Sequence, residues 1–191
     1  MTRARRPGRV FVISSPSGGG KTTVVERLRQ AMPSLARSVS VTTRPPRSGE
    51  RQGRDYRFVT AAQFDRLRRS GALLECARVH GAWYGTRKRP VLEALGRGRR
   101  IILSIDVQGA RKVRRALGER AVLIFLVPPS LVRLKRRLMA RRTESRAAIR
   151  QRLAAAKREL ACASRYDHRV VNDRLDQAVR DVRAIIASHS R

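Results

Sequence analysis

Several features are scarce or missing in this chain of 191 residues. Its two cysteines, Cys76 and Cys162, have neither the spacing of a metal site nor the number that a disulfide framework needs. No apolar run approaches the length of a membrane span, and the longest covers residues 121–127. The apolar run at 10–13 is too short for the core of a signal peptide, and no cleavage site follows it. These absences predict a cytoplasmic protein that does not act at a membrane.

Aromatic residues make up only 4% of the chain, and Asp and Glu together number only 14. At 41% hydrophobic residues the chain can still bury a core, made mainly of Val, Leu, Ile and Ala. The net charge of +31 favours an anionic partner such as a nucleotide, a nucleic acid or a membrane surface. The alternative is arginine dispersed over a solvated surface, and we favour it because the arginines are not interleaved with aromatic residues. We therefore expect non-specific polyanion binding at low salt, but no specific nucleic-acid partner.

A glycine-rich stretch at 15–22, Ser-Pro-Ser-Gly-Gly-Gly-Lys-Thr, is the feature around which the chain is organised. It follows the apolar run 10–13 and precedes a helical pattern at 23–32, which is the context of a phosphate-binding loop. Lys21 would reach the outer phosphates of a nucleoside triphosphate, and the Thr22 hydroxyl would ligate Mg²⁺. The usual pattern has glycine where Ser15 stands, and a plain glycine turn is the alternative interpretation.

Apolar runs and helical periodicities alternate along the chain, which predicts an α/β fold with a parallel sheet flanked by helices. The predicted core strands are 10–13, 101–105, 121–127 and 169–171, and the predicted core helices are 23–32, 107–117, 130–140, 146–163 and 175–188. Stretch 38–87 predicts an inserted antiparallel lobe with strands at 56–59 and 73–79, a helix at 61–70 and a turn at 81–85. We expect Thr60 to cap the lobe helix and Thr86 to cap a helix that runs to Leu95. The polar segment 141–146 predicts a short mobile lid.

The inserted lobe contains candidate ligands for a phosphate. Arg44 and Arg47 lie three residues apart in a segment stiffened by two prolines, which suits a fork-like grip on an anion. Tyr56 and Tyr84 offer hydroxyl donors to the same group. Because 40 of the 45 basic residues are arginine, ordinary surface arginines explain the pair equally well.

Two carboxylates are candidates for the second substrate. Glu75 lies on a predicted strand, and a carboxylate accepts two N–H groups from one edge of guanine, a pair that adenine does not present. The alternative is a strand glutamate paired with a neighbouring arginine. Asp106 follows the strand 101–105, whose carboxyl end faces the ligand crevice in an α/β sheet. A role with Mg²⁺ or the acceptor and a role as the cap of the next helix both remain open for Asp106.

Six motifs occur in the order and at the spacing of guanylate kinases. They are Ser-Pro-Ser-Gly-Gly-Gly-Lys-Thr at 15–22, Ser-Val-Ser-Val-Thr-Thr-Arg-Pro-Pro-Arg at 38–47, Gly-Arg-Asp-Tyr at 53–56, Glu75 with Val-His-Gly-Ala-Trp-Tyr-Gly-Thr at 79–86, Ile-Asp-Val-Gln-Gly at 105–109 and Val-Asn-Asp at 171–173. The chain resembles this family from about residue 9 to residue 186. The resemblance implies a single domain over 1–191, with a core at 9–37, 88–128 and 166–191, a GMP-binding lobe at 38–87 and a lid region at 129–165.

The resemblance also implies a role for individual residues. The ATP-binding residues would be Ser15, Pro16, Ser17, Gly18, Gly19, Gly20, Lys21, Thr22 and Thr23. Ser40, Glu75 and Thr86 would contact guanine, and Asp106 would also face the GMP site. The GMP phosphate would be held by Arg44, Arg47, Tyr56 and Tyr84. The catalytic residues would be Lys21 with Arg137, Arg141 and Arg152, which match family arginines that bind or approach the ATP phosphates, and Thr22 would ligate Mg²⁺ together with water and the nucleotide phosphates.

The implied reaction converts ATP and GMP to ADP and GDP, a step of purine nucleotide metabolism and GMP recycling. The chain departs from the family at Ser15, at Ser104, where the family usually has an Asp, and in the lid, which lacks a glycine and has fewer acids. Two alternatives are a kinase of another small phosphorylated acceptor on the same fold and a non-catalytic guanylate-kinase-like binding module. Lys21 and Thr22 argue against the second, because such modules lack a working phosphate loop. The sequence leaves a monomer and a homo-oligomer equally open.

Overall fold

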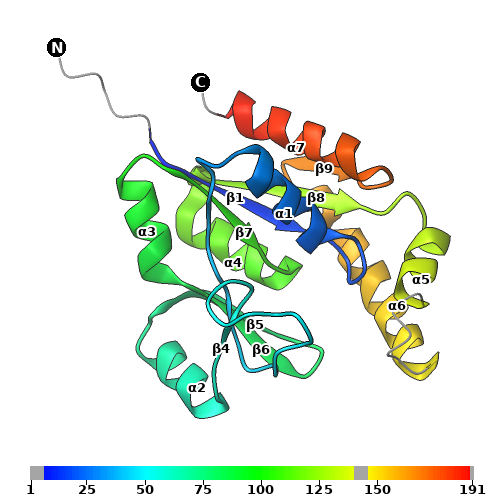
Figure 1. The fold of residues 1–191 in the computed structure, drawn as a ribbon, viewed down its shortest axis with the longest axis horizontal. Coiled ribbons are helices and arrows are strands. Elements are labelled where there is room, and N and C mark those ends of the chain that lie inside the picture. Colours follow the sequence, from blue (N-terminus) through cyan, green and yellow to red (C-terminus); the bar gives the residue numbers. More distant parts are fainter. Residues whose placement is uncertain (1–6, 140–145, 190–191) are drawn as a thin grey trace. The chain divides into compact units, whose positions relative to one another are not determined.

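The structure is a computed structural model that describes residues 7–139 and 146–189. Strands and helices are interspersed along the chain, as Figure 1 shows. The chain divides into two compact units, of which the first is Met1–Val12 with Pro33–Val122 and the second is Ile13–Met32 with Leu123–Arg191. The boundaries fall within two strands, β1 (Arg9–Ser14) and β8 (Ala121–Val127). The three-part organisation of core, lobe and lid stays a prediction.

The larger sheet has five strands in the order β2-β7-β1-β8-β9. Its remaining strands are β2 (Ala36–Arg37), β7 (Arg100–Ser104) and β9 (His168–Val171). Strand β2 pairs in parallel with β7, and β8 pairs in parallel with β9. Strands β1 and β8 are apolar and buried along almost their whole length, as strands covered by helices on both faces must be. The predicted α/β fold with a parallel sheet flanked by helices is confirmed.

The first unit also contains a four-stranded sheet in the order β4-β3-β6-β5. Its strands are β3 (Val41–Thr42), β4 (Arg57–Phe58), β5 (Leu73–Val79) and β6 (Ala82–Arg87). Helix α2 (Ala61–Arg69) begins at a capping box in which the Thr60 hydroxyl accepts from the Gln63 N–H and the Gln63 side chain accepts from the Thr60 N–H. The antiparallel prediction holds for β3 with β6 and for β5 with β6, but β3 and β4 are parallel.

The prediction of a turn at 81–85 was wrong, because most of that segment belongs to strand β6. The chain reverses one step earlier, at His80 (φ 48°) and Gly81 (φ 86°). Gly85 is a strand residue, and a Cβ there would lie 3.0 Å from Leu73 Cδ1, so this glycine serves close packing. Thr86 lies in β6 and does not cap the next helix, α3 (Lys88–Gly96), whose cap position is Arg87.

Helix α4 (Val107–Leu117) completes the first unit with the short 3₁₀ turn η1 (Gly118–Arg120). Asp106 caps α4, since its Oδ1 accepts a hydrogen bond from the Gly109 N–H at 2.9 Å. The helix packs against β5 of the smaller sheet. This packing brings the start of α4 to the strand that carries Glu75.

The second unit contains α1 (Lys21–Ala31), α5 (Leu131–Met139), α6 (Arg146–Ala161), the 3₁₀ turn η2 (Cys162–Arg165) and α7 (Leu175–Ser188). Helix α5 begins after Ser130, whose hydroxyl accepts a hydrogen bond from the Arg133 N–H as a helix cap does. Helices α5 and α6 pack together through Leu134, Leu138 and Ala156. The predicted lid segment 141–146, including Arg141, lies outside the described residues apart from Arg146 at the start of α6.

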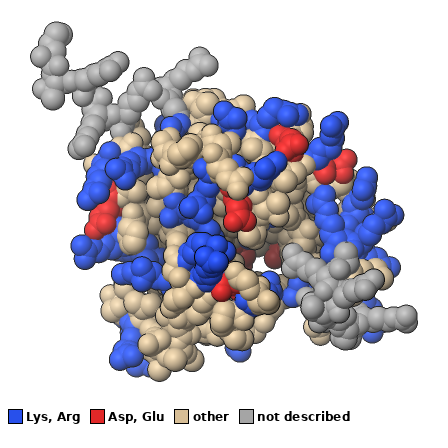
Figure 2. Space-filling view, viewed as in Figure 1, with Lys and Arg blue, Asp and Glu red and all other residues tan. Residues whose placement is uncertain are grey.

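Lys and Arg side chains are spread over the face shown in Figure 2, with few Asp and Glu among them. This distribution agrees with arginine dispersed over a solvated surface. Both cysteines are free thiols. Among the helices of the described residues, none is both long and apolar enough to cross a membrane.

Candidate active site

The glycine-rich stretch 15–20 forms a loop between the buried strand β1 and helix α1 in the second unit. Gly18 (φ 82°) and Gly20 (φ 87°) have left-handed backbone conformations that other residues rarely adopt. The Gly19 N–H donates to Pro16 O at 2.8 Å and closes the turn. The structure thus gives a physical reason for two of the three consecutive glycines, and a phosphate loop fits this strand–loop–helix arrangement.

Ser15, the departure from the usual loop pattern, fits its place. Ser15 is buried, and it does not have the left-handed backbone that would demand glycine. Its hydroxyl donates to Pro16 O at 3.1 Å, and a Cβ on Gly19 would lie 2.8 Å from Ser15 Cβ. The small residue required for this contact is at position 19, so serine is tolerated at position 15.

The start of α1 presents its first residues to an anion. Lys21 is the first helical residue and is half-buried, and Thr22 and Thr23 are exposed in the same turn. The first turn of α1 contains no acidic residue, so its N–H groups and positive dipole end favour a negatively charged ligand. Helix α1 begins two residues earlier than predicted. It therefore includes Lys21, which we expect to contact the phosphates, and Thr22, which we expect to ligate magnesium.

Asn172, which follows strand β9, holds the loop in place. Its side-chain amide is buried and donates to Gly19 O at 2.7 Å. A Cβ on Gly20 would collide with the amide nitrogen of Asn172, so the third glycine makes room for this side chain as well as adopting its own left-handed backbone. The backbone carbonyl of Asn172 in turn accepts a hydrogen bond from Arg137 Nη2 at 3.0 Å. One residue therefore fixes both the loop and an arginine predicted to act on ATP.

Helix α6 contacts the loop at Ser17. Arg152 donates to Ser17 Oγ at 3.4 Å, and the Ser17 N–H donates to Glu159 Oε2 at 3.3 Å. These two side chains lie two helical turns apart and face the same loop residue. The structure thus brings the predicted residues Arg137 and Arg152 to the loop and its supporting Asn172, while Arg141 is not described.

The donor set of the loop suits magnesium that arrives with a nucleotide. In the described part of the chain, no cluster of three or more His, Cys, Asp or Glu side chains could hold a metal ion. Mg²⁺ in nucleotide sites keeps several waters and takes phosphate oxygens with few protein oxygens. The exposed Thr22 hydroxyl fits the part of such a protein ligand.

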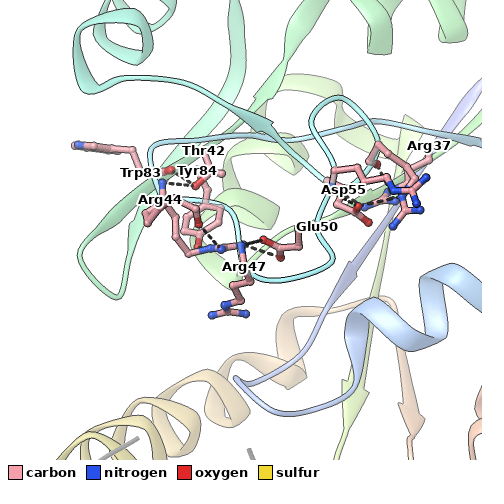
Figure 3. Close-up of polar contacts among 11 residues, drawn as sticks. Arg37, Thr42, Arg44, Arg47, Glu50, Asp55, Trp83 and Tyr84 are labelled. Carbon is pink, nitrogen blue, oxygen red and sulfur yellow. Dashed lines mark hydrogen bonds and ion pairs between the residues drawn. The ribbon is translucent and has the colours of Figure 1, made fainter. Parts of the chain in front are cut away.

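In the first unit, the lobe gathers Arg44, Tyr56 and Tyr84 into one cluster, which Figure 3 shows in part. Arg44 Nε donates to the Tyr84 hydroxyl at 3.2 Å, and the guanidinium carbon lies 5.4 Å from the centre of the Tyr56 ring. Thr42 fixes the turn, because its hydroxyl donates to Trp83 O and accepts from the Arg44 N–H. Burial raises the pKa of Tyr56, so its hydroxyl keeps the proton that a donor to an anion needs.

In the structure, the side chain of Arg44 forms an ion pair with Glu50. Arg44 Nη2 donates to both Glu50 oxygens, at 2.8 and 2.9 Å, and the Arg47 N–H donates to Glu50 Oε2 at 2.8 Å. Burial alone would lower the pKa of Arg44, but its hydrogen bonds with Glu50 and Tyr84 outweigh burial and raise the pKa. The side chain of Arg47 is exposed and extends away from this cluster (Figure 3). Glu50 therefore contacts the side chain of Arg44 but only the backbone of Arg47.

Glu75 and Thr86 face each other across strands β5 and β6. Both are buried, and Thr86 Oγ1 donates to Glu75 Oε1 at 2.6 Å. Burial raises the pKa of Glu75 to about 7, and the Asp106 charge adds to this rise, while the Thr86 hydrogen bond and the Lys112 charge oppose it. The alternative of a strand glutamate paired with a neighbouring arginine is wrong, because the side-chain partner of Glu75 is a threonine. A buried carboxylate with one oxygen held by a hydroxyl suits a ligand that donates hydrogen bonds.

For three other positions named from the sequence, the structure gives a location but does not establish a role toward a substrate. Asp106 caps α4 and also accepts from Gln108 Nε2, so the helix-cap interpretation is confirmed and its role toward a substrate stays a prediction. Ser40 is half-buried, and its carbonyl accepts from the Arg57 N–H at 2.8 Å. Ser104 is the half-buried last residue of β7.

The sequence had assigned no role to Glu50, Asn172 or Glu159. Their partners are a nearby arginine for Glu50 and the loop at 17–19 for the other two. One signal was available for Asn172, because a polar residue directly after an apolar strand lies at the carboxyl end of that strand. The acids could be found only from the fold.

Comparison with known proteins agrees with this geometry. The family model for guanylate kinase matches residues 7–189. A guanylate kinase of Gloeobacter violaceus is 49% identical over 178 residues, which cover 93% of this chain and 86% of that protein. A guanylate kinase of Nocardia farcinica is 45% identical over 190 residues, which cover 98% of each chain.

Solved structures give the same result. The crystal structure of guanylate kinase from Anaplasma phagocytophilum superposes with a TM-score of 0.82 at 33% identity, covering 96% of this chain and 87% of that one. A gluconokinase from Sinorhizobium meliloti, at 17% identity and a TM-score of 0.52 with 97% and 95% coverage, shares the fold alone. With a family model matched over nearly the whole length and relatives close to half identical, this chain belongs to the guanylate kinase family.

Proposed function

We propose that one set of residues binds ATP and a second set binds GMP during phosphoryl transfer from ATP to GMP. The chain is a kinase of the guanylate kinase family, and it phosphorylates GMP with ATP to give GDP and ADP. The acceptor is a phosphate oxygen that is already ionised at neutral pH, so no general base is required. Catalysis then depends on positioning and on neutralisation of charge.

The donor set lies in the second unit. The N–H groups at the start of α1 and the ammonium group of Lys21 would hold the β- and γ-phosphates, with Thr22 as a protein ligand of the accompanying Mg²⁺. Bound magnesium would offset negative charge on the phosphates. Arg137 and Arg152 are already oriented by Asn172 and Ser17, and with Arg141 they would offset charge on the transferring group.

The acceptor set lies in the first unit, and the buried Glu75–Thr86 pair is the observation that carries the assignment. Ionised Glu75 would accept the two N–H groups from one edge of guanine, with Thr86 and Ser40 beside it. Arg44, Arg47, Tyr56 and Tyr84 would hold the GMP phosphate, and Asp106 would face the same substrate. A phosphate and a carboxylate suit the same guanidinium, so GMP would take the place of Glu50 on Arg44.

This proposal extends to the setting of the enzyme. We infer that ATP and GMP are its small-molecule partners, that Mg²⁺ accompanies ATP and that the protein works in the cytoplasm. We also infer the three-part division into a core at 9–37, 88–128 and 166–191, a GMP-binding lobe at 38–87 and a lid region at 129–165. The family and its curated relatives support the substrates, and the dispersed arginines support the expectation of no specific nucleic-acid partner.

A coupled ADP-release assay with GMP, AMP, CMP and UMP tests the proposal. We expect turnover stimulated by GMP and preference over AMP by a factor on the order of 10⁴, because a site built around buried hydrogen-bonding groups rejects a base that leaves them unpaired. A kinase of another phosphorylated acceptor would instead be stimulated by a compound other than GMP. A non-catalytic module would bind GMP without releasing ADP.

A further inference from the structure

Gly109 occupies a position where the backbone gives no reason for glycine. It is the third residue of helix α4, is buried, and does not have a left-handed φ. Glycine is disfavoured at helical positions relative to alanine. The reason for glycine here must therefore be the space that a side chain would fill.

That space is occupied by the carboxylate of Glu75. A Cβ on Gly109 would lie 2.6 Å from Glu75 Oε2 and 3.1 Å from Glu75 Cδ. A carbon and an oxygen that are not bonded do not approach to 2.6 Å without one of them moving. The other oxygen, Oε1, accepts the hydrogen bond of Thr86 at 2.6 Å. The carboxylate thus has one oxygen fixed by strand β6 and the other against the first turn of α4.

The helix is itself anchored at this distance from the strand. Lys112, one turn further along α4, donates its ammonium group to the carbonyl of Cys76, the neighbour of Glu75 on β5. Asp106 caps the helix through the Gly109 N–H at 2.9 Å. Because Lys112 ties the helix to strand β5 and Asp106 fixes its first turn, a new side chain at position 109 would displace the Glu75 carboxylate, the flexible end of a long side chain, sooner than the helix.

We propose that Gly109 is a positioning residue for guanine recognition, because the missing side chain lets the first turn of α4 pack directly against Glu75 and fixes where Oε2 meets the base. The inference rests on the proposed role of Glu75. It adds a specificity determinant that contacts the carboxylate and lies 34 residues beyond it in the chain. It also predicts that the effect of a side chain at position 109 depends on the length of residue 75.

Gly109→Ala tests this directly, with Gly96→Ala as its matched control. Gly96 is also helical, but a Cβ there would meet nothing within 4 Å. We expect Gly109→Ala to raise KM for GMP by at least tenfold while KM for ATP stays within twofold of the wild type. Gly96→Ala should leave both constants unchanged.

Two further readouts separate positioning from a general structural effect. Inosine monophosphate lacks the amino group of guanine, so a displaced Oε2 should reduce the preference for GMP over inosine monophosphate by about the same factor as it raises KM. In a Glu75→Asp background the shorter side chain withdraws the carboxylate. There, adding Gly109→Ala should change KM for GMP by less than threefold.

The outcomes are decisive in each direction. The inference is overturned if Gly109→Ala leaves KM for GMP unchanged, or if it costs the same factor in the wild-type and Glu75→Asp backgrounds. If the single variant fails to fold by circular dichroism, folding of the Glu75→Asp/Gly109→Ala double variant supports the clash, and failure of both overturns it. Wild-type protein that neither binds nor turns over GMP would refute the proposed function itself, and the inference with it.

Discussion

Replacing Glu75 by glutamine should make the folded protein more stable at neutral pH and, at the same time, weaken its recognition of GMP. Glu75 is 5% exposed, and burial raises its pKa from 4.5 to about 7. Between these two values the folded protein holds a proton that the unfolded chain has already released. Stability contributed by the protonated carboxyl is therefore fully present below pH 4.5 and is lost as the pH rises through about 7.

The magnitude follows from the size of the shift. Each unit is worth about 1.4 kcal/mol, so the rise from 4.5 to about 7 corresponds to a loss of about 3 kcal/mol between acidic and slightly alkaline pH. Glutamine has nearly the same shape and carries no proton that titrates in this range. Glu75→Gln should match the wild type near pH 4 and exceed its free energy of unfolding at pH 8 by up to about 3 kcal/mol.

Urea unfolding at intervals from pH 4 to pH 8 measures the difference, with Glu93→Gln as the control. Glu93 is an exposed helical glutamate whose pKa is lowered by its hydrogen bond to Arg89, so its replacement should give no stabilisation at pH 8. The reasoning is refuted if Glu75→Gln follows the same pH dependence as the wild type. It is refuted equally if the glutamine variant is the less stable protein at pH 8.

The same carboxyl predicts the pH dependence of substrate binding. Only ionised Glu75 accepts two N–H groups, so KM for GMP should fall as the pH rises through about 7 in the wild type. The phosphate group of GMP also titrates, near pH 6, and it contributes the same pH dependence of KM to the wild type and to Glu75→Gln. The fall near pH 7 should be absent from Glu75→Gln, whose KM for GMP should be higher throughout.

Two other changes test the donor side. Asn172→Ala removes the hydrogen bond to the Gly19 carbonyl and leaves a buried acceptor unpaired, at a cost of roughly 1–3 kcal/mol. If that cost is expressed in ATP binding, KM for ATP should rise by about five- to a hundredfold, and initial rates with each substrate varied should show KM for GMP unchanged. Ser104→Asp restores the carboxylate that the family usually has at the end of β7, and a magnesium titration of the rate should then reach half-saturation at a lower concentration. If the two proteins titrate alike, the missing carboxylate does not limit the reaction.

The parts of the fold that could be predicted from the sequence are those with long, uninterrupted patterns. Strand β8, helix α4 and helix α7 have the predicted bounds, because each has a continuous apolar run or a helical period ended by a glycine or polar residue. Most of strand β6 was mistaken for a turn because Gly81 precedes the strand and Gly85 lies within it. Only Gly81 has the turn conformation, while Gly85 is explained by its neighbours on another strand.

The candidate site likewise contains some residues that could be identified from the sequence and others that could not. The loop residues and the lobe motif could be found because each is continuous in the chain. The partner of Glu75 could be found only through the family resemblance, since nothing in the sequence states that residues 75 and 86 are paired across two strands. Asn172 and Glu159 contact a loop that lies more than 140 residues earlier. The end of a strand could place Asn172 at the ligand edge of the sheet, but no local pattern could identify the loop residue that either side chain contacts.

The hydrogen bond between Asn172 and Gly19 has a consequence for synthesis of the protein. The two residues are 153 positions apart, so the loop leaves the ribosome well before its anchor. The hydrogen bond can form only after strand β9 and Asn172 have been synthesised, so the loop lacks this contact until then. An ATP site that depends on this contact is therefore complete only after strand β9 has been made.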